Sequence, residues 1–216
     1  MIYILGAGAM ATDVFDIYID LGKESEVAGF LEENCQREKA LLLGKEINDV
    51  SILKDLNRDT VKLICGIGTP LRKRLVEYTK DLGFRYDTAI HPSVLQSRFL
   101  TLGEGIISAA NDIIKSQVTI GNHTLILSTS IVGHGVHIGE FTTVSSGVLI
   151  GGNSRIGNNC FIGMGTVIIQ QISVGNNSFI GAGSVVTRDI PDNVLAVGVP
   201  AKPIREITES DWKELI

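Results

Sequence analysis

A glycine-rich turn near the start of the chain, together with an acidic residue further along, has the spacing of a nucleotide-binding site. The turn Gly6-x-Gly8-x-x-Ala11 follows the apolar segment 2–5 and opens a predicted helix. Such a turn presents backbone N–H groups and the positive end of a helix to a pyrophosphate. Glu33 ends the next predicted strand, where a carboxylate can bind ribose hydroxyls. Taken alone, the pattern is compatible with NAD, although the remaining chain offers no dehydrogenase partner domain.

Two histidines in the central region, His134 and His137, are side chains that titrate near working pH. A neutral imidazole can accept a proton, which makes a histidine a candidate for acid–base chemistry. His137 directly precedes Ile138, an expected inward position, and is therefore expected to face outward as a surface histidine. With His123 eleven residues before His134, the spacing does not fit the three zinc ligands of a γ-carbonic-anhydrase-like site, and no metal is expected.

A six-residue repeat predicts the element that must position these histidines. Every sixth residue from Ile120 to Val186 is aliphatic, and a glycine often follows it. This period makes no stripe on an α-helix and differs from the period of two in an ordinary strand. It is typical of a parallel β-helix with three short faces in each eighteen-residue coil, whose tight corners suit glycines with positive φ. The phase extends back to Ile114 and Leu102 with a break at Ser108, which predicts a less regular first coil near Leu102.

The first ninety residues instead alternate strands and helices. The apolar patterns predict strands at 2–5, 27–31, 61–65 and 86–90, and helices at 12–21 and 71–82. Strand–helix alternation with glycines at strand ends indicates an α/β, Rossmann-like domain with a parallel sheet. His91–Pro92 marks its end, because the residue before a proline is extended. The expected organisation is a Rossmann-like domain at 1–92, a β-helix at 93–203 and a tail at 204–216, with one helix capped by Thr208 or Ser210.

Composition and charge exclude several classes of protein. The chain has 216 residues, of which 44% are hydrophobic but only 6% aromatic, and this suits a narrow prism filled by aliphatic side chains. A net charge of −5 without a dense Lys/Arg cluster argues against nucleic acid. The three cysteines are widely spaced and indicate reduced thiols of a cytoplasmic protein, with Cys160 packed inside. We expect no secretory leader and no membrane span.

Several sequence segments resemble a known family. IGNNCFIGMGTVI, IGAGSVVTRDIPDN and VGVPAKPI resemble the hexapeptide-repeat acyltransferases, while ILGAGAMATDV, GFLEEN, CGIGTPLRKRL and AIHPSV resemble its sugar O/N-acetyltransferases of the sialic-acid and bacillosamine type. The resemblance covers nearly the whole chain. It implies a left-handed β-helix, acetyl-CoA as cosubstrate, and a homotrimer that binds acetyl-CoA between adjacent β-helices. It also implies that the N-terminal domain holds a nucleotide-linked amino sugar, or a sugar acid in the O-acetylating branch.

The resemblance assigns roles to individual residues. His134, in SIVGHGVHIGEF, matches the general base, and Gly152, in LIGGNSRIG, matches the glycine whose N–H stabilises the oxyanion. The matching cofactor-binding positions are Gly163, Met164, Gly181, Ala182 and Lys202, with Arg205 nearby. The matching substrate-binding positions are Gly8, Ala9, Met10, Glu33 and the Gly66–Gly68 turn, including Gly68. Arg72 is expected to be a solvated helix residue and His91 a junction residue.

Two positions depart from the family pattern. Relatives usually carry Glu or Asp directly after the histidine, whereas this chain has Gly135, so Glu140, a carbonyl or water must orient the ring. Met10 replaces a histidine that bacillosamine-type relatives often carry. N-acetylation of a nucleotide-linked amino sugar for surface-glycan synthesis is favoured. O-acetylation of a sialic-acid-like sugar, a non-catalytic sugar-nucleotide-binding trimer and a nicotinamide-dependent enzyme are the alternatives.

Overall fold

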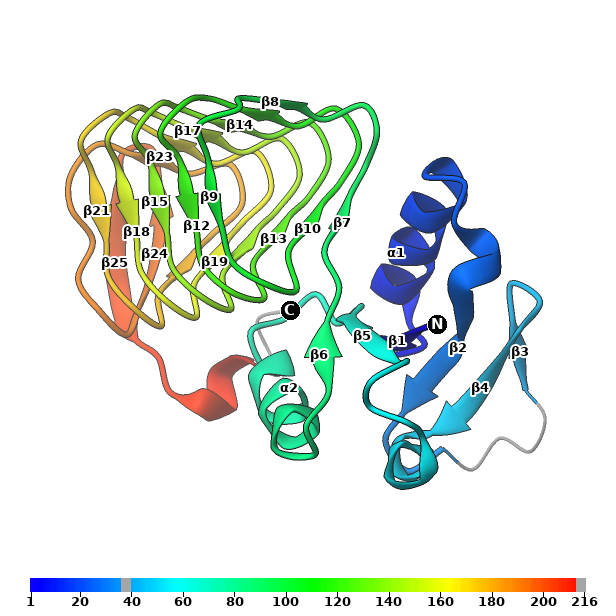
Figure 1. The fold of residues 1–216 in the computed structure, drawn as a ribbon. Helices are drawn as coiled ribbons and strands as arrows, with labels where there is room; N and C mark the ends of the chain where they lie inside the picture. Colours follow the sequence, from blue (N-terminus) through cyan, green and yellow to red (C-terminus); the bar gives the residue numbers. More distant parts are fainter. Residues whose placement is uncertain (36–39, 213–216) are drawn as a thin grey trace. The chain divides into compact units, whose positions relative to one another are not determined.

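A computed structural model describes residues 1–35 and 40–212 of the chain. By its internal contacts the chain divides into two compact units, Met1–Gly68 with Arg72–Pro92, and Thr69–Leu71 with Ser93–Ile216. The first unit is an α/β sheet domain and the second is a left-handed parallel β-helix (Figure 1). Within the described residues, no helix is long and apolar enough to cross a membrane.

The first unit is a six-stranded sheet with the strand order β3-β4-β2-β1-β5-β6. All neighbouring strands are parallel except β3 and β4. Its elements are β1 (Ile2–Leu5), α1 (Ala9–Asp20), η1 (Glu24–Glu26), β2 (Val27–Glu32), β3 (Leu41–Leu42), β4 (Lys45–Asp49), η2 (Val50–Asp55), β5 (Lys62–Cys65), α2 (Arg72–Asp81) and β6 (Arg85–Tyr86).

The strand order places a topological switch point between β1 and β5. From this centre the chain moves outward to β2 on one side and to β6 on the other. Right-handed crossovers in opposite directions put α1 and α2 on opposite faces of the sheet. The carboxyl ends of β1 and β5, where open α/β sheets bind ligands, therefore lie side by side.

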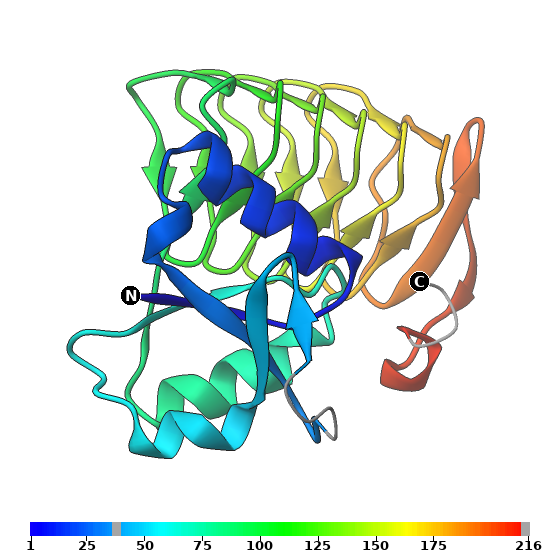
Figure 2. The same ribbon diagram turned by 90° about the vertical axis from the view of Figure 1, so that its right-hand side faces the viewer.

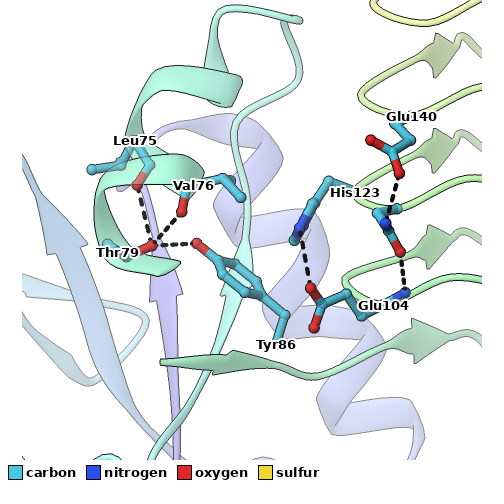
Figure 3. Close-up of polar contacts among 8 residues, drawn as sticks. Leu75, Val76, Thr79, Tyr86, Glu104, His123 and Glu140 are labelled. Carbon is cyan, nitrogen blue, oxygen red and sulfur yellow. Dashed lines mark hydrogen bonds and ion pairs between the residues drawn. The ribbon is translucent and has the colours of Figure 1, made fainter. Parts of the chain in front are cut away.

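Each helix is held to this sheet by specific contacts. α1 buries Val14, Phe15 and Tyr18, and Phe15 meets Phe30 of β2 edge to face with ring centroids 5.8 Å apart. α2 is tied to β6 through the buried Thr79, whose hydroxyl oxygen lies 2.6 Å from the hydroxyl of Tyr86 (Figure 3).

The predicted elements of this unit differ from the structure in two places. The hairpin β3–β4 was not predicted, because these strands are short and half exposed. It turns at Leu43 and Gly44, both with positive φ. The predicted strand 86–90 is two strands, β6 and β7 (Ala89–Ile90), and only β6 belongs to this sheet. The other predicted strands and both helices are present, with ends shifted by up to three residues.

The β-helix is a triangular prism of three sheets, named here by number (Figure 1). Sheet I contains β10 (Ile107–Ser108), β13 (Leu125–Ile126), β16 (Thr143–Val144), β19 (Phe161–Ile162), β22 (Phe179–Ile180), β24 (Val194–Gly198) and β25 (Ala201–Glu206). Sheet II contains β8 (Leu95–Gln96), β11 (Ile113–Ile114), β14 (Ile131–Val132), β17 (Leu149–Ile150), β20 (Val167–Ile168) and β23 (Val185–Val186). Sheet III contains β9 (Thr101–Leu102), β12 (Thr119–Ile120), β15 (His137–Ile138), β18 (Arg155–Ile156) and β21 (Ser173–Val174). The turns between these sheets form edges I–II, II–III and III–I.

The aliphatic residue of each hexapeptide fills the interior of the prism, as the repeat predicted. Ile120 pairs with Ile138 and Ile138 with Ile156, eighteen residues apart, and all three are buried. Ser108 keeps the phase instead of breaking it, since it is fully buried and its hydroxyl donates to Asp112 at 2.8 Å. The regular coils also start before Leu102, because β8 already pairs with β11.

The repeat glycines are needed for close coil stacking, which corrects their expected role. A β-carbon on Gly121 would lie 2.6 Å from the backbone nitrogen of Glu140 in the next coil. The positive φ angles occur two residues later in each turn, for example at His123 and Asn153. The coils therefore require small residues at one turn position and left-handed residues at another.

The last coil is closed by an antiparallel pair of strands (Figure 2). β25 pairs with β24, so the expected tail boundary at residue 203 falls inside a strand. The expected tail helix is the 3-10 turn η3 (Glu209–Asp211), in which the backbone N–H of Thr208 donates to the carboxylate of Asp211. Trp212 follows and packs against Phe179 with ring centroids 5.9 Å apart.

Candidate functional site

A cavity of about 460 Å³ lies at the switch point of the first unit. The turn after β1, the end of β2 and the turn after β5 form its walls. All five residues expected to bind the substrate line this cavity, namely Gly8, Ala9, Met10, Glu33 and Gly68. Apolar walls from Leu31, Ile67 and Leu75 complete it. The fold thus brings together the residues that the sequence predicted to share a site.

Glycine at position 66 lets the first helix start beside the cavity. A β-carbon on Gly66 would lie 2.6 Å from the Cα of Ala11, so only glycine allows α1 to pack this closely against the turn. α1 begins with Gly8 as its N-cap, and no side chain caps the helix. A helix start without a side-chain cap favours an anionic group.

An ion pair that was not predicted from the sequence lies at this cavity. The guanidinium of Arg74 lies 2.6 Å from the carboxylate of Glu33, and the two side chains are 78% and 39% exposed. Arg72, expected to be solvated, is instead 1% exposed, and this corrects the sequence-based expectation. Burial lowers the pKa of Arg72 to about 10. Arg74 is on the exposed face of α2, but nothing in the sequence pattern singled it out among the cations of this helix.

In the β-helix, His134 and Gly152 share edge II–III in consecutive coils. The His134 ring lies against Gly152, because a β-carbon on Gly152 would be 2.5 Å from the ring Cε1. His134 is exposed, and its ring makes no hydrogen bond to a described residue. The N–H of Gly152 likewise donates to no described residue. The edge thus places an imidazole next to an available backbone donor.

The backbone amides at the second turn position differ between the edges of the prism. At edge III–I the amides of Glu104, Glu140, Asn158 and Asn176 donate to a side chain from the next coil, whereas the amide of Asn122 donates to no described residue. At edges I–II and II–III the equivalent amides of Met164, Ala182 and Gly152 donate to no described residue. Uncapped donors therefore occur on the two edges that border sheet II.

Glu140 does not serve as the acid partner of His134. It lies at edge III–I, whereas His134 lies at edge II–III on the opposite side of sheet III. Its carboxylate accepts a hydrogen bond of 2.7 Å from Asn122, whose own carbonyl oxygen accepts from the N–H of Glu104 (Figure 3). Glu140 thus belongs to the polar ladder of edge III–I.

The expected cofactor residues Gly163, Met164, Gly181 and Ala182 occupy edge I–II. Met164 is 61% exposed and Ala182 is exposed. Gly163 and Gly181 directly precede these two residues, and only glycine fits at either position. A β-carbon on Gly163 would lie 2.6 Å from the backbone nitrogen of Ala182, and one on Gly181 would lie 2.7 Å from the side chain of Val197. Lys202 is exposed in β25. Within one chain the residues of edge I–II and His134 lie on opposite edges of sheet II.

Sheet II carries an apolar stripe between these two edges. Its outward residues are in register and all aliphatic, namely Leu95, Ile113, Ile131, Leu149, Val167 and Val185. Leu95 is 67% exposed and Leu149 is 41% exposed. An exposed aliphatic stripe of this length is typical of a protein–protein interface. Sheet III is polar by contrast, with His137, Arg155 and Ser173 facing outward, and His137 is exposed as expected.

Two further observations concern His91 and potential metal ligands. His91, expected to be a junction residue, lies 2.7 Å from the carboxylate of Asp20 at the end of α1. No group of three or more potential metal ligands occurs among the residues that the structure describes.

Three family models match the chain. Residues 1–79 match the PglD N-terminal domain, residues 117–152 match the hexapeptide repeat of succinyl-transferase, and residues 153–188 match the bacterial transferase hexapeptide. No match was found among curated proteins.

Solved structures match over nearly the whole chain. A perosamine N-acetyltransferase from Caulobacter crescentus, in complex with CoA and GDP-perosamine, is 31% identical with a TM-score of 0.89, covering 95% of this chain and 97% of that one. The acetyltransferase domain of PglB from Neisseria gonorrhoeae, in complex with acetyl coenzyme A, is 26% identical with a TM-score of 0.86, covering 94% and 98%. WeeI from Acinetobacter baumannii is 22% identical with a TM-score of 0.84, covering 94% and 99%, and supports the fold alone.

Proposed function

This chain belongs to the hexapeptide-repeat sugar N-acetyltransferases, and from that membership we propose that it acetylates the amino group of a nucleotide-linked amino sugar with His134 as general base. It is an acyltransferase that uses acetyl-CoA. The nucleotide-sugar acceptor is supported by the perosamine N-acetyltransferase, which is in complex with CoA and GDP-perosamine.

The contact between His134 and Gly152 carries the mechanistic part of the proposal. The sugar amine must lose a proton as it attacks the thioester carbonyl, and the imidazole of His134 accepts that proton. Negative charge develops on the carbonyl oxygen, and the N–H of Gly152 is a donor with no other described partner. A single edge of the prism then supplies both groups that the reaction needs.

The position of the cofactor residues supports a homotrimer with shared sites. Met164 and Ala182 lie across sheet II from His134, so one chain does not bring them together. In three copies around an axis that faces sheet II, edge II–III of one chain meets edge I–II of the next. The aliphatic stripe on sheet II would be buried around that axis, which suits a closed symmetric assembly.

The cavity of the first unit is proposed to hold the nucleotide sugar. The start of α1 would face the pyrophosphate, and Glu33 would accept hydrogen bonds from the ribose. All three cysteines are free thiols, which supports a reducing compartment such as the cytoplasm.

Thiol release from acetyl-CoA tests the function. The purified protein is assayed with GDP-, dTDP- and UDP-linked 4-amino and 3-amino sugars and with a sialic acid. His134→Ala is the test variant and His137→Ala, an exposed histidine three residues away, is the matched control. We expect release with at least one nucleotide amino sugar, a loss of about 100-fold or more in His134→Ala, and unchanged activity in His137→Ala.

Other outcomes point to the alternative functions. Release with the sialic acid alone would replace N-acetylation by O-acetylation. No release with any acceptor, combined with measurable binding of a nucleotide sugar, would favour the non-catalytic trimer. Full activity of His134→Ala would refute the role of this histidine.

Mixed assemblies test the shared site. His134→Ala and Ala182→Trp are each expected to be inactive, because each damages a different wall of the same site. When the two chains are denatured and refolded together at equal amounts, a trimer should restore about a quarter of the wild-type activity, because a quarter of the interfaces combine two intact edges. No recovery from a folded mixed trimer, or a monomer by sedimentation at micromolar concentration, would contradict the shared site.

A further inference from the structure

His134 and Asn153 occupy the same gap between two coils at edge II–III. The His134 ring extends to Gly152, one coil further along. The carboxamide oxygen of Asn153 extends in the opposite direction and lies so close to Gly135 that a β-carbon there would collide with it. Because Gly135 follows His134 and Asn153 follows Gly152, the two side chains enter this gap from adjacent turn positions. The N–H of Asn153 also donates to the His134 carbonyl at 2.8 Å.

No carboxylate is available to orient the His134 ring within this part of the chain. The titratable or charged side chains nearest in the adjoining turn and strands are Lys115, His137 and Arg155, and none is an acid. Glu140 is held on the opposite edge of sheet III by Asn122. A hydrogen-bond acceptor for the imidazole N–H must therefore be a neutral group or come from outside these elements.

The local backbone explains why Asn153 can fill this place. Gly135, Asn153 and Gln171 occupy the same left-handed turn position in consecutive coils, with φ angles of 65°, 58° and 63°. At edge III–I the equivalent asparagines bond to one another, as Asn159 donates to Asn177 at 3.1 Å. Asn153 has a glycine above it, so its carboxamide makes no such bond and remains available.

We propose that Asn153 is a positioning residue: the His134 ring, which makes no hydrogen bond to a described residue in this structure, turns so that its imidazole N–H donates to the Asn153 carboxamide oxygen, which takes the place of the missing carboxylate. The bond would fix which ring nitrogen carries the proton and leave the other free to accept one from the acceptor. A neutral acceptor stabilises the protonated ring less than a carboxylate does. This inference rests on the proposed role of His134.

Two substitutions at position 153 test the proposal without disturbing the turn. Asn153→Gly keeps the left-handed backbone and removes the acceptor, so we expect kcat to fall at least about tenfold while the KM for acetyl-CoA changes little. Asn153→Asp also tolerates the left-handed conformation and adds a charge. A carboxylate favours the protonated imidazole, so the acid limb of the pH–rate profile should move up by about one pH unit. Gln171→Gly, at the same position one coil later, should change neither quantity.

An NMR titration of His134 separates this inference from the proposed function. The pKa of the His134 imidazole should rise in Asn153→Asp relative to wild type and stay constant in Gln171→Gly. An unchanged His134 titration in Asn153→Asp, or an unchanged kcat in Asn153→Gly, would overturn the proposal. A shifted titration in a protein that transfers no acetyl group would support the contact and refute the proposed function.

Discussion

The imidazole of His134 lies directly against the Cα of Gly152, so a β-carbon at position 152 would be 2.5 Å from its Cε1. Gly152→Ala should therefore displace the ring and lower kcat by about tenfold or more, with little change in the thermal midpoint because the ring is exposed. Enzyme assays and thermal unfolding of the same preparations check this. In a His134→Ala background, Gly152→Ala should cause no further loss of activity, and an additive second loss would contradict the steric explanation.

The pair formed by Arg74 and Glu33 should affect substrate binding more than stability. Both side chains are partly exposed, so loss of the pair should leave the thermal midpoint unchanged. Arg74→Ala should nevertheless raise the KM for the nucleotide sugar several-fold, because Glu33 loses the group that orients it beside the cavity. Lys73→Ala is the control, since Lys73 pairs with Glu77 elsewhere on α2. An equal effect of both substitutions on KM would exclude a specific role for Arg74.

Replacement of Gly66 should destabilise the first unit. The β-carbon of Gly66→Ala would meet the Cα of Ala11 at 2.6 Å and the side chain of Ile4 at 3.0 Å, so α1 must move away from the sheet. We expect the free energy of unfolding to fall by about 1–3 kcal/mol, as for other overpacked cores. Urea unfolding followed by circular dichroism measures it. Gly22→Ala is the comparison variant. Gly22 has a φ of +70°, and an added β-carbon there meets nothing within 4 Å, so this substitution causes backbone strain without a packing collision.

Two buried thiols should make the protein less stable in alkali. Burial raises the pKa of Cys160 to about 12 and that of Cys65 to about 11. An unfolded thiol ionises near pH 8.5, so above that pH the unfolded state loses protons that the folded state keeps, and stability falls as pH rises. Cys160→Ala should remove up to about 1.4 kcal/mol of this loss per pH unit. Urea unfolding at pH 7.5 and pH 10 measures it, and an identical loss in wild type and variant would contradict the prediction.

Thiol labelling gives a second readout of the same burial. At pH 8, a thiol reagent should modify Cys35, which is partly exposed, and should spare Cys65 and Cys160 until the protein unfolds. The comparison of native and urea-treated protein checks this. Rapid modification of Cys160 in the native state would mean that the coil around it opens readily.

The β-helix could be predicted from the sequence because its core is a one-dimensional pattern. One inward residue in every six, such as Ile126 or Val144, specifies both the coil and its register. The roles of the glycines could not be derived in this way. Glycine is required at these positions because the next coil lies so close. A pattern along the chain carries no information about that distance. The short hairpin β3–β4 escaped prediction for the opposite reason, since its two strands bury too little to produce a pattern.

The candidate sites were predictable only in part. The members of the nucleotide cavity follow strand ends, and strand ends meet at a switch point, so Gly8 and Glu33 could be placed together. The burial of Arg72 depends on the rotation of α2, which its few apolar residues do not fix. The pair between Arg74 and Glu33 depends on the same rotation.

The polar turns of the β-helix did carry a usable signal in the sequence. Glu140, Asn158 and Asn176 are spaced eighteen residues apart, and all three fall on edge III–I. His134 lies six residues before Glu140, which is one face of the prism away. Two residues one face apart lie on different edges, so this spacing alone excludes Glu140 as the acid partner of His134.

β25 covers the last strand of sheet I at one end of the prism. A stack of similar coils has no internal stop, because each finished coil exposes strand edges on which another chain could build. On sheet I the antiparallel β25 covers the edge of β24, and it presents Lys202, Pro203 and Arg205 to the solvent. Proline lacks the N–H that a further strand would need, and the charges oppose burial. The β24–β25 hairpin therefore opposes the addition of a further strand to sheet I.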